Sequence, residues 1–178
     1  MIEKVKAKIR EIKDFPKPGI GFKDIMPLIQ DAEAFSYVIE RISDWVRELK
    51  PQVITGIESR GFLFAAPVAY KLGLGLTVIR KKGKLPAETL CLRAPNEYAV
   101  EHFEMHVDSI QQGERVIIVD DLIATGSSSI CAIDLVKKLG GETVGFASIV
   151  DLSFLKGIEK IQGAHPDVSV FSLIQFDK

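Results

Sequence analysis

The sequence has few of the residues that build disulfide frameworks and metal sites. Among 178 residues there are two cysteines and three histidines. Cys91 and Cys131 lack a CxxC spacing, which is typical of reduced thiols in an intracellular protein. The histidines show no metal-ligand grouping, and His102 and His106 lie four residues apart in a predicted strand, too far along it to converge on one ion. We therefore expect no disulfide and no metal ion held directly by protein side chains.

Long apolar runs and an excess of charge are missing as well. The formal net charge is −1 and the isoelectric point is about 6.3, which gives no electrostatic basis for binding nucleic acid or an acidic membrane. No apolar run is long enough to cross a bilayer, and residues 1–15 are charged throughout and lack the apolar core of a signal peptide. With 47% hydrophobic residues, the chain is expected to fold as a single domain, residues 1–178, in the cytoplasm.

Predicted strands and helices alternate along the chain. Short apolar runs predict buried strands at residues 53–57, 76–79, 116–119, 143–150 and 168–176. Helical spacing of apolar residues predicts helices at 2–13, 35–49, 63–72 and from 130 onward, and a short helix at 153–161 capped by Ser153. Residues 87–99 are expected to form a loop or hairpin. Residues 100–107 alternate as in a strand, with Phe103, Met105 and Val107 on one face and His102, Glu104 and His106 on the other. This order predicts an α/β fold with a mostly parallel central sheet flanked by helices.

The strongest candidate for a functional site is the stretch 116–130, VIIVDDLIATGSSSI. An apolar strand is followed at once by Asp120 and Asp121, and then by small and hydroxyl-bearing residues that lead into a helix. Backbone N–H groups at a helix N-terminus favour a phosphate group. Two carboxylates at the carboxyl end of a strand can accept hydrogen bonds from sugar hydroxyls or hold a hydrated Mg²⁺. The alternative is a capped helix beside two solvated aspartates, which is less favoured because both aspartates directly follow a buried strand.

This stretch resembles the phosphoribosyl-diphosphate (PRPP) binding motif of the type I phosphoribosyltransferases. The resemblance implies that Asp120 and Asp121 contact the ribose hydroxyls and act in catalysis. It also implies that the following loop holds the 5′-phosphate through Ala124, Thr125, Gly126, Ser127 and Ser128. The family usually has Thr-Gly-Gly-Thr where this chain has Thr-Gly-Ser-Ser. Ser127 is unfavourable if its position requires a positive φ, and suitable if it is the helix N-cap.

The segment Phe15–Asp24, FPKPGIGFKD, is similar to the stretch FPxPGxxFxD of the adenine-specific members of that family. This similarity implies that Phe22 stacks on the adenine ring and that backbone groups near Gly21 and Lys23 bind its edge, with Leu122 in the same base site. A flat heterocycle suits an aromatic face and a few fixed polar groups. Residues 1–30 are then expected to form a helix and a small hood over the base.

The polar loop at residues 58–62, ESRGF, follows the predicted strand at 53–57. An arginine next to a glycine suits bidentate contact with a phosphate group, although a surface salt bridge is the usual role of a single arginine. The loop resembles the pyrophosphate loop of the family, whose first residue is more commonly Asp than Glu. The resemblance implies that Ser59 and Arg60 bind pyrophosphate.

The basic run at residues 80–86, RKKGKLP, follows the next predicted strand. Its four cations repel one another unless an anion neutralises them, and the usual meaning of such a run is a solvated face. The run resembles the RKxGKLP segment of the family. This resemblance implies that Arg80, Lys81 and Lys84 reach pyrophosphate, often in the neighbouring subunit of a homodimer.

The three polar loops 58–61, 80–84 and 120–129 follow strand ends, so they are expected to gather at one edge of the sheet. Residues 87–99 are placed to act as a lid that excludes water from a glycosyl cation. The segment 98–102 is similar to the YxxEY segment of the family, which implies that Glu101 is the acid of the reaction. His102 stands where that segment often has a second tyrosine.

Together these resemblances imply transfer of the 5-phosphoribosyl group from PRPP to adenine with Mg²⁺, giving AMP and pyrophosphate in purine salvage. One alternative is a phosphoribosyltransferase for a 6-oxopurine. Another is a PRPP-sensing transcription regulator, which would need a basic face or a DNA-binding element longer than the predicted N-terminal helix. A nucleotide-binding protein without catalysis would require a damaged motif, and only Ser127 points that way.

Overall fold

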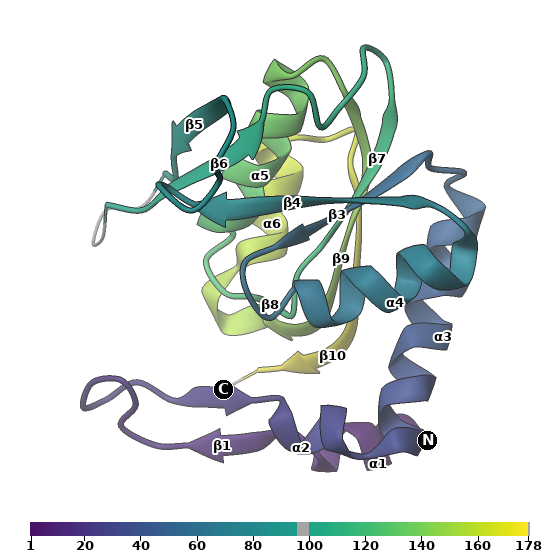
Figure 1. Ribbon diagram of the computed structural model, residues 1–178. Coiled ribbons are helices and arrows are strands. Elements are labelled where there is room, and N and C mark those ends of the chain that lie inside the picture. The colour runs from purple at the N-terminus through teal and green to yellow at the C-terminus, as the bar shows by residue number, and fades with distance from the viewer. Residues whose placement is uncertain (96–99, 178) are drawn as a thin grey trace. The chain divides into compact units, whose positions relative to one another are not determined.

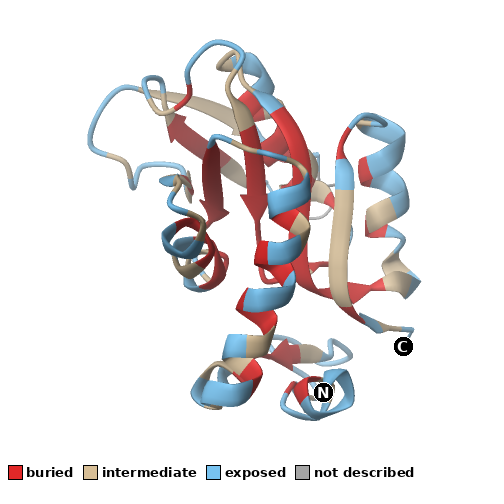
Figure 2. Ribbon diagram, turned by 90° about the vertical axis from the view of Figure 1, so that its right-hand side faces the viewer, coloured by how far each residue is buried: buried red, intermediate tan, exposed pale blue. Residues whose placement is uncertain are grey.

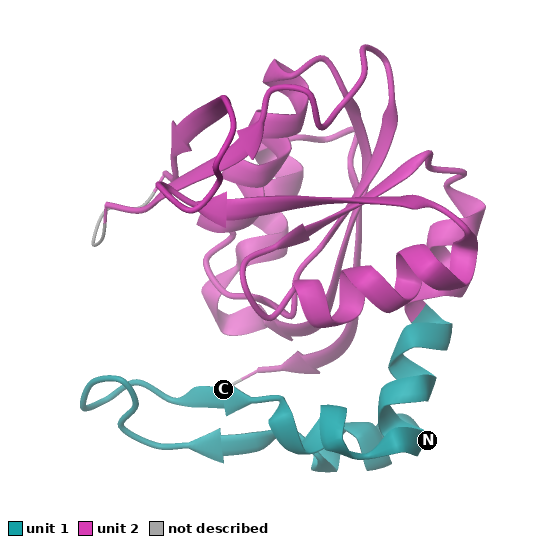
Figure 3. Cartoon of the chain, in the orientation of Figure 1, with its two compact units in different colours: residues 1–41 teal, residues 42–178 magenta. Residues whose placement is uncertain are grey.

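In the computed structural model, residues 1–95 and 100–177 are described, and the chain forms two compact units, residues 1–41 and residues 42–178 (Figures 1 and 3). The boundary falls within one helix, α3 (Ala32–Glu48). No helix among the described residues has the length and apolarity needed to cross a bilayer.

The N-terminal unit contains a two-stranded antiparallel sheet between short helices. Its elements are α1 (Ile2–Ala7), β1 (Arg10–Ile12), β2 (Phe22–Asp24), α2 (Met26–Gln30) and the first part of α3. The prediction of a helix over residues 2–13 is therefore wrong beyond Ala7. Arg10 pairs with Asp24 across the sheet, and its Nε donates to Asp24 Oδ2 at 3.0 Å, so strand pairing overrides the helical spacing of the apolar residues.

The second unit is built on a sheet with the strand order β10-β9-β7-β3-β4-β6-β5 (Figure 1). Neighbours from β10 to β4 are parallel, β6 and β5 are antiparallel additions, and β8 pairs in parallel with β9 off this path. The prediction of an α/β fold with a mostly parallel sheet is confirmed. The strands are β3 (Val53–Ile57), β4 (Gly75–Lys81), β5 (Thr89–Arg93), β6 (His102–His106), β7 (Arg115–Val119), β8 (Leu122–Ile123), β9 (Glu142–Leu152) and β10 (Ser169–Phe176).

Helices cover both faces of this sheet, and the central strands are buried (Figure 2). On one face, a side chain at Gly56 of β3 would meet Ala65 of α4 (Phe62–Leu72), and Trp45 of α3 stacks on Phe171 at 5.3 Å. On the other face, apolar residues of the strands cluster with Ile133 of α5 (Ser127–Lys138) and with α6 (Gly157–Ala164). The near-continuous apolar strands are therefore explained by burial on both sides.

Several element predictions need correction. Residues 89–93 and 102–106 form a hairpin, but Val107, expected on its apolar face, is 41% exposed because it lies past the end of β6. The predicted helix at 153–161 is interrupted: a 3-10 turn, η1 (Ser153–Leu155), precedes α6. Ser153 is not its cap, since its Oγ donates to Phe176 O at 3.1 Å. Two-residue strand β8 was not predicted.

Candidate active site

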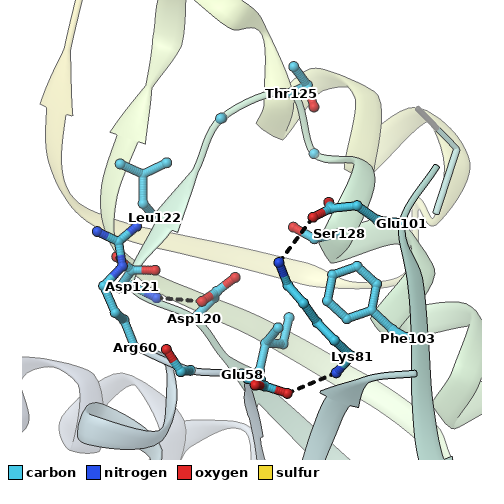
Figure 4. Close-up of a pocket in the computed structure, with 14 residues that line it drawn as sticks. Glu58, Arg60, Lys81, Glu101, Phe103, Asp120, Asp121, Leu122, Thr125 and Ser128 are labelled. Carbon is cyan, nitrogen blue, oxygen red and sulfur yellow. Dashed lines mark hydrogen bonds and ion pairs between the residues drawn. The ribbon is translucent and has the colours of Figure 1, made fainter. Parts of the chain in front are cut away.

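A cleft of about 230 Å³ lies at the carboxyl ends of β3, β4 and β7 (Figure 4). Three loops that the sequence singled out contribute to its walls, as expected from the topology of a parallel sheet. Predicted site residues that line it are Ser59, Arg60, Lys81, Glu101, Asp120, Asp121, Leu122, Ala124, Thr125, Gly126 and Ser128. The prediction that these loops gather at one edge of the sheet is confirmed.

The other predicted residues are placed differently. Arg80 and Lys84 do not line the cleft, and both contact Glu58, which does. Ser127 begins α5 beside the cleft. Phe22 belongs to the N-terminal unit, together with its neighbours at 21 and 23. Two residues of the predicted acid segment 98–102, residues 98 and 99, lie outside the described residues.

The acidic pair is buried at the base of the cleft. Asp120 is 8% exposed and Asp121 is 5% exposed. Asp120 Oδ1 accepts a hydrogen bond from the Asp121 amide at 2.9 Å. Burial, and then the neighbouring Asp121 carboxylate, raise the pKa of Asp120 well above its ordinary value. These carboxylates are costly to hold together in a protein interior, which is typical of groups that act on a ligand.

Arg60 lies directly beside this pair (Figure 4). Its Nε is 2.9 Å from Asp121 Oδ2. Burial raises the pKa of Asp121, and the charge of Arg60 opposes that rise. The loop at residues 58–61 and the acidic pair are therefore in direct electrostatic contact.

The loop before α5 has the geometry of an anion site. Gly126 has φ = 83°, and a Cβ added to it would lie 2.8 Å from Gly157 O, so this position requires glycine. Ser127 is the first helical residue, with an ordinary negative φ, and its Oγ donates to Pro95 O at 2.9 Å. The departure from Thr-Gly-Gly-Thr therefore leaves the strained position occupied by glycine. The first-turn N–H groups of α5 have no partners within the helix and can bind a phosphate.

The loop after β3 is packed tightly against the sheet. A Cβ on Gly61 would lie 2.6 Å from Ile57 O and 2.7 Å from Val119 O. Glycine at this position lets the chain turn back over β3 and β7, which brings Arg60 to the cleft. This physical requirement explains the Arg-Gly pair of the sequence.

Glu58 gathers the basic loop onto the cleft. Its side chain is 7% exposed, and it accepts hydrogen bonds from Lys84 Nζ, from the Lys81 amide at 2.9 Å and from Arg80 Nε at 3.3 Å. Burial opposes the charge of Glu58, but these donors, with Lys84 first among them, lower its pKa below the ordinary value. The anion that neutralises much of the basic run is thus a carboxylate of the chain.

Lys81 and Glu101 face each other across the open side of the cleft (Figure 4). Lys81 Nζ lies 3.2 Å from Glu101 Oε1, and both side chains remain substantially exposed. Beside this pair, Phe103 of β6 supplies an apolar part of the cleft wall (Figure 4). An exposed ion pair of this kind contributes little stability, so a charged ligand can replace it.

The predicted base segment has its own local order in the N-terminal unit. The rings of Phe15 and Phe22 are 5.1 Å apart in an edge-to-face arrangement. Lys23 is buried, and its Nζ lies 3.1 Å from Glu11 Oε1. A Cβ on Gly21 would approach the same carboxylate oxygen at 3.2 Å.

Sequence reasoning missed Glu58 as a partner of the basic loop and Phe103 as a cleft residue. A signal for Glu58 existed, since it is the one acid within the loop expected to face four cations. No signal pointed to Phe103, whose place depends on the pairing of Lys81 with it across β4 and β6.

Comparison with known proteins agrees with this geometry. The family model of the phosphoribosyl transferase domain matches residues 28–178. The adenine phosphoribosyltransferase of Caldicellulosiruptor saccharolyticus is 46% identical over 173 residues, which is 97% of each chain.

Solved structures are similar over almost the whole length. The crystal structure of adenine phosphoribosyltransferase from Thermoanaerobacter pseudethanolicus is 45% identical, with a TM-score of 0.93 over 99% of this chain and 100% of that one. The enzyme from Saccharomyces cerevisiae, complexed with an imino-altritol bisphosphate and adenine, is 34% identical, with a TM-score of 0.87 over 97% and 98% of the chains.

Proposed function

The chain belongs to the adenine phosphoribosyltransferases, within the phosphoribosyl transferase domain family, and from this premise we propose how its own residues perform the reaction. The reaction transfers the 5-phosphoribosyl group of PRPP to adenine and gives AMP and pyrophosphate. The observation that carries the proposal is the buried Asp120–Asp121 pair, which lies in one cleft with Arg60 and the N-terminus of α5. This arrangement offers separate sites for a sugar, a diphosphate and a monophosphate.

In this proposal the 5′-phosphate binds the loop of residues 124–128. Thr125 and Ser128 line the cleft and supply hydroxyl donors, and the first-turn amides of α5 supply N–H donors. The helix dipole adds to the attraction for the phosphate charge. The ribose then lies over the two aspartates, which accept hydrogen bonds from its hydroxyls.

The pyrophosphate leaves toward the basic side of the cleft. Ser59, Arg60 and Lys81 line that side, and Arg80 and Lys84 reach it through Glu58. As the bond at C1′ breaks, positive charge develops on the ribose. Asp120 and Asp121 stabilise that charge more than the neutral ground state, which lowers the barrier.

Mg²⁺ fits this site as a partner of the substrate. Among the described residues no cluster of three or more His, Cys, Asp or Glu side chains could enclose an ion. Mg²⁺ commonly binds through one or two carboxylates, water and substrate phosphates, and the buried oxygens of Asp120 and Asp121 match that donor set. When bound, the ion would neutralise charge on the leaving diphosphate.

For the base, we propose that Phe22 stacks on adenine while backbone groups at Gly21 and Lys23 bind its edge, with Leu122 in the same site. Leu122 lines the cleft. We further propose that residues 1–30 cover the base, that residues 87–99 act as a lid, and that the chain folds as a single domain. Glu101 is proposed to manage the purine proton as N9 attacks C1′.

A homodimer is the proposed assembly. Leu63 and Tyr70 lie seven residues apart on α4 and are 41% and 90% exposed, so they share one apolar face. Sedimentation of the chain should give a dimer, and Tyr70→Glu should shift it toward a monomer. A monomer at all concentrations would reject this assembly. The cytoplasm is the proposed compartment, in keeping with two free thiols at Cys91 and Cys131.

The function is tested by AMP formation from PRPP and Mg²⁺, with adenine, hypoxanthine and guanine supplied in parallel. Turnover with adenine alone is expected. Turnover with a 6-oxopurine would keep the PRPP site and reject the assignment of Phe22. Binding of PRPP without turnover of any base would favour a PRPP-sensing regulator.

A further inference from the structure

A buried carboxylate on β6, Glu104, lies outside the lining of the cleft and has no part in the steps above. It is 4% exposed. It stands on the middle strand of the antiparallel set β4-β6-β5, opposite Arg80 on one side and Cys91 on the other. A buried charge destabilises a protein strongly unless nearby partners compensate for the lost hydration. Its partners therefore indicate what it does.

Those partners are backbone amides of the basic loop. Glu104 Oε1 accepts hydrogen bonds from Gly83 N at 3.1 Å, Lys84 N at 3.0 Å and Leu85 N at 3.0 Å. Its other oxygen accepts from Thr89 Oγ1 at 3.3 Å. Three successive N–H groups that converge on one point form a concave anion site, and here the anion is supplied by the chain itself.

The loop that Glu104 holds has no regular structure of its own. Residues 82–88 connect β4 to β5 without a helix or strand, and Gly83 turns the chain with φ = 87°. The Lys84 carbonyl accepts from Arg80 Nη1 at 3.2 Å, while Lys84 Nζ contacts Glu58 at the cleft. Glu104 thus fixes the backbone of Lys84 on one side, and Glu58 engages its side chain on the other.

We propose that Glu104 is a positioning residue for pyrophosphate binding, which acts by holding the backbone of residues 83–85 so that Lys84 is aimed at the cleft. The inference rests on the proposed function, because it takes the diphosphate of PRPP as the ligand of this loop. A cation whose backbone is already ordered loses less conformational freedom on binding. The incoming diphosphate then has only to replace the carboxylate of Glu58 at Lys84 Nζ.

The test compares Glu104→Gln and Glu104→Ala with a matched control, Glu114→Gln. Glu114 also accepts a backbone amide, Gln111 N at 2.9 Å, but in an exposed turn outside the cleft. Three quantities are measured: the KM for PRPP, the KM for adenine and the Kd for inorganic pyrophosphate.

Glu104→Ala is expected to raise the KM for PRPP and the Kd for pyrophosphate about tenfold, since displacement by about 1 Å can cost up to about a hundredfold. The KM for adenine should change by less than about twofold. Glu104→Gln should give a smaller rise, because its amide oxygen still accepts the three N–H groups without the charge. Glu114→Gln should change none of them.

A double-mutant cycle separates positioning from a general loss of structure. In the background Lys84→Met, Glu104→Gln should add no further change in the Kd for pyrophosphate, because the group it positions is gone. Additive effects would overturn the proposal, and so would an unchanged pyrophosphate Kd in Glu104→Gln. If Glu104→Ala does not fold, Glu104→Gln and the cycle decide.

Failure of this inference differs from failure of the proposed function. If the wild-type chain forms no AMP from any base, the function is rejected, and the pyrophosphate titration still tests Glu104. If the wild-type chain is active and both Glu104 variants bind pyrophosphate as it does, the positioning role alone is rejected.

Discussion

Two pairs of buried carboxylates lie at the same edge of the sheet and differ in what satisfies them. Glu58 and Glu104 accept hydrogen bonds from lysine and arginine side chains and from backbone amides, and their pKa values are lowered despite burial. Asp120 and Asp121 lie side by side with Arg60 as their nearby cation, and their pKa values are raised by burial. The partners of the first pair are all supplied by the chain, whereas the second pair destabilises the fold until a ligand binds to it.

This difference separates positioning from binding. A carboxylate whose partners are already present holds a loop in place and stabilises the fold. A carboxylate kept close to a like charge in the interior lowers stability, and such a cost is retained where a ligand or transition state compensates for it. The contrast yields predictions in which loss of a carboxylate impairs function at both pairs, but raises stability at Asp120 and lowers it at Glu104.

The largest effect is expected for Asp120→Asn. Loss of the carboxylate that faces the developing ribose charge should lower kcat/KM about a thousandfold. The same change removes a like charge from Asp121 and should raise the melting temperature by roughly 2–4 °C, which corresponds to about 1 kcal/mol in a domain of this size. Steady-state kinetics and thermal unfolding of one preparation check both, with the exposed Asp108→Asn as control. A destabilised variant that keeps its activity would contradict the comparison.

Glu101 belongs to neither pair, because its side chain is partly exposed and forms an ion pair with Lys81. Glu101→Gln should lower turnover about a hundredfold, as expected for loss of a general acid or base, with PRPP affinity nearly unchanged. Equal losses of turnover and affinity would reject the chemical role. Glu97→Gln, four residues earlier in the sequence, is the comparison: a larger loss of turnover there would move the acid to Glu97.

Lys84→Met tests the role of the cation that Glu58 holds at the cleft. It removes a partner of Glu58 and should weaken pyrophosphate binding about tenfold, as expected for loss of one charge-assisted contact. The matched control is Lys82→Met, whose Nζ makes no ion pair with the residues that the structure describes, and whose effect should be about twofold or less. Titration with pyrophosphate measures both. Equal effects would mean that net charge matters and placement does not.

The smallest effects are expected in the pH dependence of stability. Because the folded pKa of Glu104 lies below its ordinary value of 4.5, its contribution is present above that value and is lost as the pH falls through the folded pKa. Asp120 behaves in the opposite way. Its ionised form lowers the free energy of unfolding at pH values above the raised folded pKa, and this destabilisation disappears as the pH falls toward 3.8. On acidification, the melting temperature of Asp120→Asn should therefore converge with that of the wild type first. The disadvantage of Glu104→Gln should persist to lower pH.

Much of this fold could be predicted from sequence because its parallel strands are buried on both faces and read as apolar β-branched runs. The position of the cleft followed, since loops after parallel strands share one edge of the sheet. Residues Arg10–Ile12 could not be predicted as a strand, because their conformation depends on pairing with Phe22–Asp24, a segment that lies beyond the reach of local sequence patterns.

Glu104 was assigned by alternation to a polar face with His102 and His106. Alternation gives the side of the strand but not what covers that side. Here the backbone of residues 83–85 covers it and turns a polar position into a buried one. Ser127 illustrates the same limit at the phosphate loop, since only the backbone angle at Gly126 shows which residue takes the left-handed position.

The most direct test of the account is the number of protons released when PRPP and Mg²⁺ bind at mildly acidic pH, measured by calorimetry in buffers of different ionisation enthalpy. If ribose hydroxyls and the bound ion stabilise the ionised carboxylates of Asp120 and Asp121, binding lowers the pKa of Asp120. The wild type then releases more protons on binding than Asp120→Asn does. The titration of PRPP itself is common to both and cancels in the difference. Equal proton release by the two proteins, with PRPP bound in each, would contradict the claim that the substrate stabilises the ionised carboxylates of Asp120 and Asp121.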